Sequence, residues 1–149
     1  MIALCLSILS LGISILGYVN SLKVRVDAEK AALYKSRLDL LKAANTAQIN
    51  WQKIVNDLYH YRDIFERSLR GEQLSTLKSA FDSWETEFVS SLENAKKMKE
   101  DIDGSFDEIT KSDAEKFFRS IEVRNASLDQ CREEMRRKFD VMDKKISKE

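Results

Sequence analysis

One stripe of apolar residues limits this chain to helix-on-helix packing. Between residues 40 and 65 the apolar positions recur alternately four and three residues apart, at Leu40, Ala44, Ala47, Trp51, Ile54, Leu58, Tyr61 and Phe65. This spacing places all of these side chains along one side of an α-helix, the side that helices bury against each other. The 149 residues include no proline, so the strongest helix breaker is missing. We therefore expect long helices that act as partners for this stripe.

Two further apolar stripes follow. Gly71 suits the residue just beyond a helix C-terminus, and Asp101 to Ser105 form a second break. Between these breaks lie Leu74, Leu77, Phe81, Trp84, Phe88, Leu92, Ala95 and Met98. After the second break the apolar positions are Phe117, Ile121, Leu128, Cys131, Met135, Met142 and Ile146. The sequence predicts helices over about residues 21–69, 72–100 and 106–147.

Short connections between these segments predict an antiparallel arrangement. Folding about Gly71 brings Tyr61 to Phe81 and Leu58 to Trp84, so that large side chains face each other. Folding again near Gly104 would set Phe88 beside Phe117. We predict an all-α fold, a long antiparallel helical hairpin or three-helix coiled-coil-like bundle over residues 40–149. Its seam contains Leu40, Trp51, Ile54, Leu58, Tyr61, Phe65, Leu77, Phe81, Trp84 and Phe88.

Charge is arranged in blocks along the chain. Residues 72–113 carry five basic and eleven acidic side chains, whereas residues 21–70 carry ten and six and residues 114–149 carry ten and eight. An acidic segment between two basic ones suits a bundle whose middle helix touches both others. The net charge of the whole chain is zero, which argues against nucleic acid as a partner.

The first residues of the chain are uncharged from Met1 to Val19. As a helix they would span about 28 Å, close to the thickness of a membrane core. We predict a single transmembrane anchor over residues 1–20, followed by a juxtamembrane stalk over residues 21–39. Lys23 and Arg25 follow the anchor, so the C-terminal region is expected in the cytoplasm. A cleaved signal peptide is the alternative, but no basic residue precedes the apolar run and no Ala-x-Ala-like site follows it.

Small residues form a second pattern inside this segment. They are Ser7, Ser10, Ser14, Gly17 and Ser21. Small residues on one face allow transmembrane helices to approach closely, which predicts self-association through this face. Alternatively, the serines bond to the backbone of their own helix. The sequence leaves both interpretations open.

The end of the third predicted helix extends beyond the turn at Gly71. If it has no neighbour there, its apolar side chains are available to a partner helix. The candidates for partner binding are Met135, Phe139, Met142 and Ile146. A frayed, partly disordered tail is the alternative.

No residue pattern suggests catalysis. The chain has one histidine, His60, and its two cysteines, Cys5 and Cys131, do not form a disulfide framework. It has no Gly-rich phosphate loop and no nucleophile elbow. The acidic residues around Gly104 lack the ligand order of a calcium loop, and helix capping explains them better. We expect no enzymatic activity, no cofactor, no metal and no small-molecule substrate.

These patterns together predict a non-enzymatic, membrane-anchored helical scaffold. Its expected partners are the lipid bilayer, further copies of itself as a homo-oligomer, and a helical protein partner that docks on exposed helix seams. One alternative is a lysis or pore component that assembles through its Ser/Gly face. Another is a secreted helical binding protein from which the leader has been cleaved.

Overall fold

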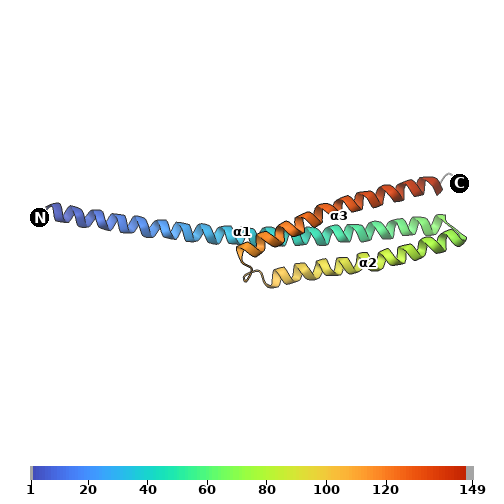
Figure 1. The fold of residues 1–149 in the computed structure, drawn as a ribbon, viewed down its shortest axis with the longest axis horizontal. Helices are drawn as coiled ribbons and strands as arrows, with labels where there is room; N and C mark the ends of the chain where they lie inside the picture. Colours follow the sequence, from blue (N-terminus) through green and yellow to red (C-terminus); the bar gives the residue numbers. More distant parts are fainter. Residues whose placement is uncertain (1, 147–149) are drawn as a thin grey trace.

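The structure is a computed structural model. It describes the backbone of residues 2–146 and the side chains of residues 14–71, 75 and 77–144. Three helices follow one another along the chain: α1 (Ile2–Ser68), α2 (Gly71–Gly104) and α3 (Lys111–Ile146) (Figure 1). No strand occurs within residues 2–146, so the prediction of an all-α fold is confirmed. The three helices pack into a bundle, with α1 between α2 and α3 in the view of Figure 1.

The first half of α1 extends well beyond the bundle (Figure 1). Every side chain from residue 14 to residue 31 is exposed, and we call this segment the arm. Among the described side chains of α1, half-burial begins at Ala32 and the first fully buried residue is Leu40. The arm and the packed part of α1 form one continuous helix, because nothing in residues 2–68 interrupts the helical hydrogen bonding.

The arm corrects the prediction of a transmembrane anchor. In the described part of the chain, no helix combines the length and the apolar character needed to cross a membrane. The prediction of a single-pass membrane protein with a cytoplasmic C-terminal region is therefore wrong.

The predicted self-association face is described only in part. Ser7 and Ser10 lie outside the residues with described side chains. Ser14, Gly17 and Ser21 are exposed on the arm. The predicted self-association through this face required a transmembrane helix, so that prediction falls together with the anchor.

The first two helices form the predicted hairpin about Gly71. Gly71 has a φ angle of 66°, in the left-handed region that glycine adopts without strain. The rings of Phe65 and Phe81 lie 6.1 Å apart, and those of Trp51 and Phe88 lie 6.0 Å apart. Phe65 thus has Phe81 as a neighbouring ring. The helices are antiparallel, as the short connection requires.

The third helix corrects the predicted order of packing. It runs parallel to α1 and packs on it: Asn125 Nδ2 donates to the carbonyl of Ala43, and Arg132 Nε lies 2.7 Å from a carboxylate oxygen of Asp57. Among the described residues, no Cα atom of α2 lies within 8 Å of a Cα atom of α3. The central helix is therefore α1, and the expected placement of Phe88 beside Phe117 is wrong. Residues 105–110 lead the chain across α1, so α3 returns along α1 and not along α2.

The bundle contains two buried clusters, one at each end. Near the 105–110 connection, small side chains of α1 meet α3, in a cluster of Leu40, Ala43, Ala44, Ala47, Ala114 and Ile121. At the end next to Gly71, aromatic side chains from all three helices meet, in a cluster of Leu58, Tyr61, Phe65, Phe81 and Phe139. Alanine on α1 lets neighbouring helices approach closely, whereas the aromatic rings fill a wider space.

The end of α3 differs from the prediction of an unpartnered tail. Phe139 is only 4% exposed, and Met135 packs against the same aromatic cluster. The expectation that these two residues lack a partner within one chain is wrong, because α3 follows α1 as far as Tyr61 and Phe65. Met142 is exposed and stays a candidate, and the side chain of Ile146 lies outside the described part.

Candidate interaction groove between α2 and α3

A groove runs between α2 and α3 on the side where the two helices stay apart. It consists of two adjoining hollows of about 530 and 650 Å³, which share Asn94, Met98, Ile121 and Arg124. The apolar and thiol side chains along it are Leu40, Ala47 and Trp51 from α1, Ala95, Met98 and Ile102 from α2, and Phe117, Ile121, Leu128 and Cys131 from α3. Each helix therefore contributes part of one apolar lining.

The base of the groove is formed by α1. Leu40 and Ala47 are buried there, and Trp51 is half-buried. The stripe of α1 that the sequence predicts is wide enough to hold α2 on one flank and α3 on the other. Because both helices dock on α1, their side chains that face each other across the groove are covered less completely.

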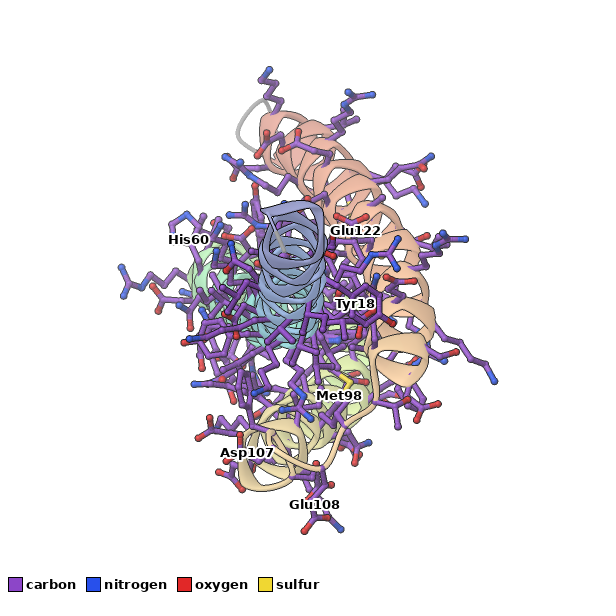
Figure 2. All side chains as sticks on the ribbon, turned by 90° about the vertical axis from the view of Figure 1, so that its left-hand side faces the viewer. Tyr18, His60, Met98, Asp107, Glu108 and Glu122 are labelled. Carbon is purple, nitrogen blue, oxygen red and sulfur yellow. The ribbon has the colours of Figure 1, made fainter. Side chains whose placement is uncertain are left out.

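The walls carry side chains that remain open to solvent. Phe117 is 54% exposed although it lies on the apolar stripe of α3. In Figure 2, which looks along α1 from the arm, Met98 lies between α2 and α3, and His60 lies on the other side of the molecule. The thiol of Cys131 is also exposed, at the end of the groove nearest Trp51. Partly covered apolar walls of this kind are typical of sites that receive an apolar helix.

Side-chain contacts tie the helices together near the Gly71 turn and near the 105–110 connection. At the end next to Gly71, the ring of Phe139 stacks on Phe81 at 5.5 Å and meets Trp84 at 5.9 Å. At the other end, Arg37 donates from Nε to the carbonyl of Ile109 at 2.7 Å and from Nη2 to that of Asp107 at 2.6 Å. Arg37 thereby holds the 105–110 connection against α1.

The charged residues along the groove gather near the 105–110 connection. Asp101, Asp113 and Lys97 line that end, and Arg124 lies in the shared middle. The other end, around Trp51 and Cys131, is lined by uncharged side chains in the described structure. The groove is thus charged at the end near the connection and uncharged at the end near Trp51.

An ion-pair network fixes α2 to α1. Arg62 lies 3.0 Å from Glu66, 2.8 Å from Asp82 and 2.5 Å from Glu85. The hydrogen bond with Glu66 is the main cause that raises the pKa of Arg62, and the nearby carboxylates add to it. Tyr59 donates its hydroxyl to Glu85 at 3.0 Å, and this bond raises the pKa of the phenol. These contacts bridge α1 and α2 directly.

The predicted seam residues occupy two kinds of position. Most are buried in the bundle: Leu40, Ile54, Leu58, Tyr61, Phe65 and Phe81. Leu77 and Phe88 are half-buried, Trp51 lies at the base of the groove, and Trp84 is exposed beside the Phe139 ring. The periodicity shows that these side chains share one side of a helix, but it does not show which helix they face.

Two buried asparagines were missed by the sequence analysis. Asn125 and Asn50 lie in the bundle with little exposure. Asn125 stands between Ile121 and Leu128 at four- and three-residue spacing, so its position on the stripe was the signal that could have found it. Its side-chain amide reaches the carbonyl of Ala43 and thereby sets the register of α3 along α1.

Within the described side chains, no group of three or more His, Cys, Asp or Glu residues could hold a metal ion. Comparison of the chain with protein-family models, with curated proteins and with solved structures found no match.

Proposed function

We propose that this chain is a non-enzymatic helical interaction protein whose groove between α2 and α3 receives an apolar helix. The observation that carries this proposal is that α2 and α3 both dock on α1 while their backbones stay apart. A fourth helix laid between them would contact both walls and complete a four-helix arrangement. It would also cover apolar side chains such as Phe117, which solvent now reaches.

The dimensions of the groove suit about four turns of helix. From Phe117 to Cys131 the wall formed by α3 is about 21 Å long, at the rise of an α-helix. A helix of that length presents apolar anchors at three- and four-residue spacing along one face. The lining is mainly aliphatic, aromatic and small, which favours burial of another apolar surface over acid–base chemistry.

Site-specific photo-crosslinking in the host cells tests this proposal. Benzoylphenylalanine replaces Phe117 or Cys131 in the groove, or Val141 as a control, because Val141 is as exposed as Phe117 but lies outside the groove. We expect covalent protein adducts from positions 117 and 131 and none from position 141. Absence of adducts from both groove positions would contradict the proposal.

A charge in the groove gives an independent check. Phe117→Glu places a carboxylate on the apolar wall, so it should greatly reduce the adduct formed from position 131. Val141→Glu introduces the same charge elsewhere on α3 and should leave that adduct unchanged. Equal adduct yields in the two variants would show that the groove is not the binding surface.

A further inference from the structure

The arm carries an unpartnered apolar stripe of its own. Ile15, Val19, Leu22 and Val26 follow one another at four, three and four residues, and they are 54%, 56%, 41% and 46% exposed. This is the spacing of a helix face that packs on other helices. Exposed side chains in such an array mark a surface that another element covers.

We propose that the groove of each copy receives the arm of a second copy of this chain, an inference that rests on the proposed function of the groove. The arm and the base of the groove belong to the same continuous helix α1. The arm therefore points away from its own bundle and cannot fold back into its own groove (Figure 1). The groove that the arm can reach is therefore that of another copy of the chain.

The arm and the groove agree in length. The groove wall from Phe117 to Cys131 measures about 21 Å, and the arm covers the same distance from Ile15 to Glu29, at 1.5 Å per residue. The apolar stripe from Ile15 to Val26 lies within this span. A single arm can therefore fill the groove from end to end.

Charge determines the direction in which the arm lies. The arm is uncharged from Ser14 to Leu22, and its charged residues follow: Lys23, Arg25, Asp27, Glu29 and Lys30. The groove is uncharged near Trp51 and Cys131 and charged near the 105–110 connection, where Asp101, Asp113 and Lys97 lie. Burying charged residues against the uncharged end would cost free energy without compensation. The charged half of the arm thus lies at the connection.

This direction makes the exchange reciprocal. The arm enters antiparallel to α1 of the receiving molecule, so the two α1 helices run in opposite directions. The arm of the receiving molecule then lies along the bundle of the other copy and reaches the groove there. Two equivalent arm–groove contacts related by a two-fold axis form a closed dimer. The opposite direction would place each bundle beyond the end of the next and would build an open chain.

Disulfide formation tests both the occupant and the direction. With Lys30 beside the connection, Ile15 and Val19 lie near Cys131 of the second copy. In the full chain with Cys5→Ser, the variants Ile15→Cys and Val19→Cys are oxidised. Val24→Cys is the control, because Val24 is exposed on the same arm but off the stripe. The substituted side chains are exposed, and circular dichroism checks that each variant keeps its helical content.

We expect the oxidised Ile15→Cys and Val19→Cys proteins to form covalent dimers and the Val24→Cys protein to stay uncrosslinked. Light scattering of the chain without added cysteines should give the mass of a dimer. A ladder of longer covalent products would overturn the closed dimer. A monomer by light scattering, or equal crosslinking of Val24→Cys, would overturn the arm as occupant. Adducts from position 117 to a different protein would then still support the proposed function of the groove.

Discussion

Phe139 connects all three helices through its ring. The ring centroid lies 4.7 Å from that of Tyr61 on α1 and 5.5 Å from that of Phe81 on α2, and the side chain itself belongs to α3. Because α2 and α3 have no close backbone contact in the described structure, this ring is a main link between them. A buried aromatic residue contributes both apolar burial and ring–ring contacts.

Replacing Phe139 by alanine should therefore strongly destabilise the bundle. We expect Phe139→Ala to lower the free energy of unfolding by about 3–5 kcal/mol, because it leaves a cavity among the aromatic side chains. Urea unfolding followed by circular dichroism measures the change. The control is Val141→Ala, an exposed site on the same helix, where we expect a change within about 0.5 kcal/mol. Similar changes for both variants would show that the aromatic cluster is not packed as described.

Because the pKa of Tyr61 is raised in the folded protein, we expect the stability of the fold to depend on pH in the alkaline range. Burial is the main cause that raises its pKa above 10.0, and the hydrogen bond that its hydroxyl donates to Asp140 at 2.7 Å adds to the effect. The neutral phenol is favoured in the folded protein, so its contribution is complete below pH 10 and is lost as pH rises through the folded pKa. Tyr61→Phe removes both the hydrogen bond and this pH dependence.

Absorbance titration at the tyrosinate band and unfolding at several alkaline pH values measure these effects. We expect the folded wild-type protein to lose stability above pH 10 more steeply than Tyr61→Phe does. At neutral pH the variant should be less stable by about 1 kcal/mol, the usual net contribution of a hydrogen bond. Parallel pH profiles for the two proteins would contradict the assignment.

At the scale of whole elements, the two glycines at the helix breaks differ in backbone conformation. Gly71 has a positive φ angle, whereas Gly104 ends α2 without one, and an added Cβ meets nothing within 4 Å at either site. Any difference in stability between alanine variants at the two sites therefore comes from backbone conformation and not from crowding of the added Cβ atom.

Alanine at these two glycines should have opposite effects. Gly71→Ala is expected to destabilise the protein by about 1–2 kcal/mol, because an L-residue with a side chain is strained in the left-handed region. Gly104→Ala should be neutral or stabilising by up to about 1 kcal/mol, since alanine loses less conformational freedom on folding. Chemical denaturation of both variants measures the change. Equal destabilisation would argue against the left-handed turn at Gly71.

The connection between α2 and α3 depends on Arg37. Its guanidinium donates to the carbonyls of Asp107 and Ile109, and it lies over the ring of Phe106 at 5.9 Å. Tyr34 also meets Phe106, with ring centroids 5.8 Å apart. These contacts direct the chain across α1, so that α3 begins beside Leu40.

Arg37→Lys should release this connection while keeping the charge. Lysine lacks the planar fork that reaches both carbonyls at once. We expect faster amide hydrogen exchange in residues 105–110 and a loss of about 1–2 kcal/mol in unfolding free energy, since two hydrogen bonds are affected. Lys35→Arg, on the same turn but exposed, is the control and should leave the exchange rates unchanged. If the amides of residues 105–110 stay equally protected from hydrogen exchange in Arg37→Lys, other contacts hold the connection.

At the scale of the whole molecule, the arm and the bundle are separable. The side chains of the arm are exposed from residue 14 to residue 31, while the buried clusters begin at Leu40. The bundle therefore contains its own core, and the arm contributes apolar surface that the bundle does not use.

Removal of residues 1–30 tests this division of roles. We expect the shortened chain to unfold cooperatively and to be a monomer by light scattering, since the core is retained and the arm is gone. The unfolding midpoint of the full chain should rise with protein concentration, because association stabilises the folded state, whereas that of the shortened chain should not. Loss of cooperative unfolding would show that the arm is part of the core.

Much of the helical organisation could be predicted from particular residues. The alternating stripe from Leu40 to Phe65 predicted the buried side of α1, and Gly71 predicted the hairpin. The predicted 72–100 and 106–147 helices correspond to α2 and α3, whose observed bounds are Gly71–Gly104 and Lys111–Ile146. The groove could not be predicted from the same stripes, because Ile121 and Leu128 looked like seam residues of an antiparallel neighbour of α2.

The amino-acid sequence by itself determined that the chain is helical, where its helices break and which side of each is apolar, because these properties depend on spacing and on local backbone preferences. The tertiary structure alone decided that α1 is the central helix, that Phe139 is buried and that a groove separates α2 from α3. Those features depend on the path of residues 105–110 across α1, held by Arg37 from a position about seventy residues earlier in the chain. Periodicity along one helix carries no information about which other helix covers it.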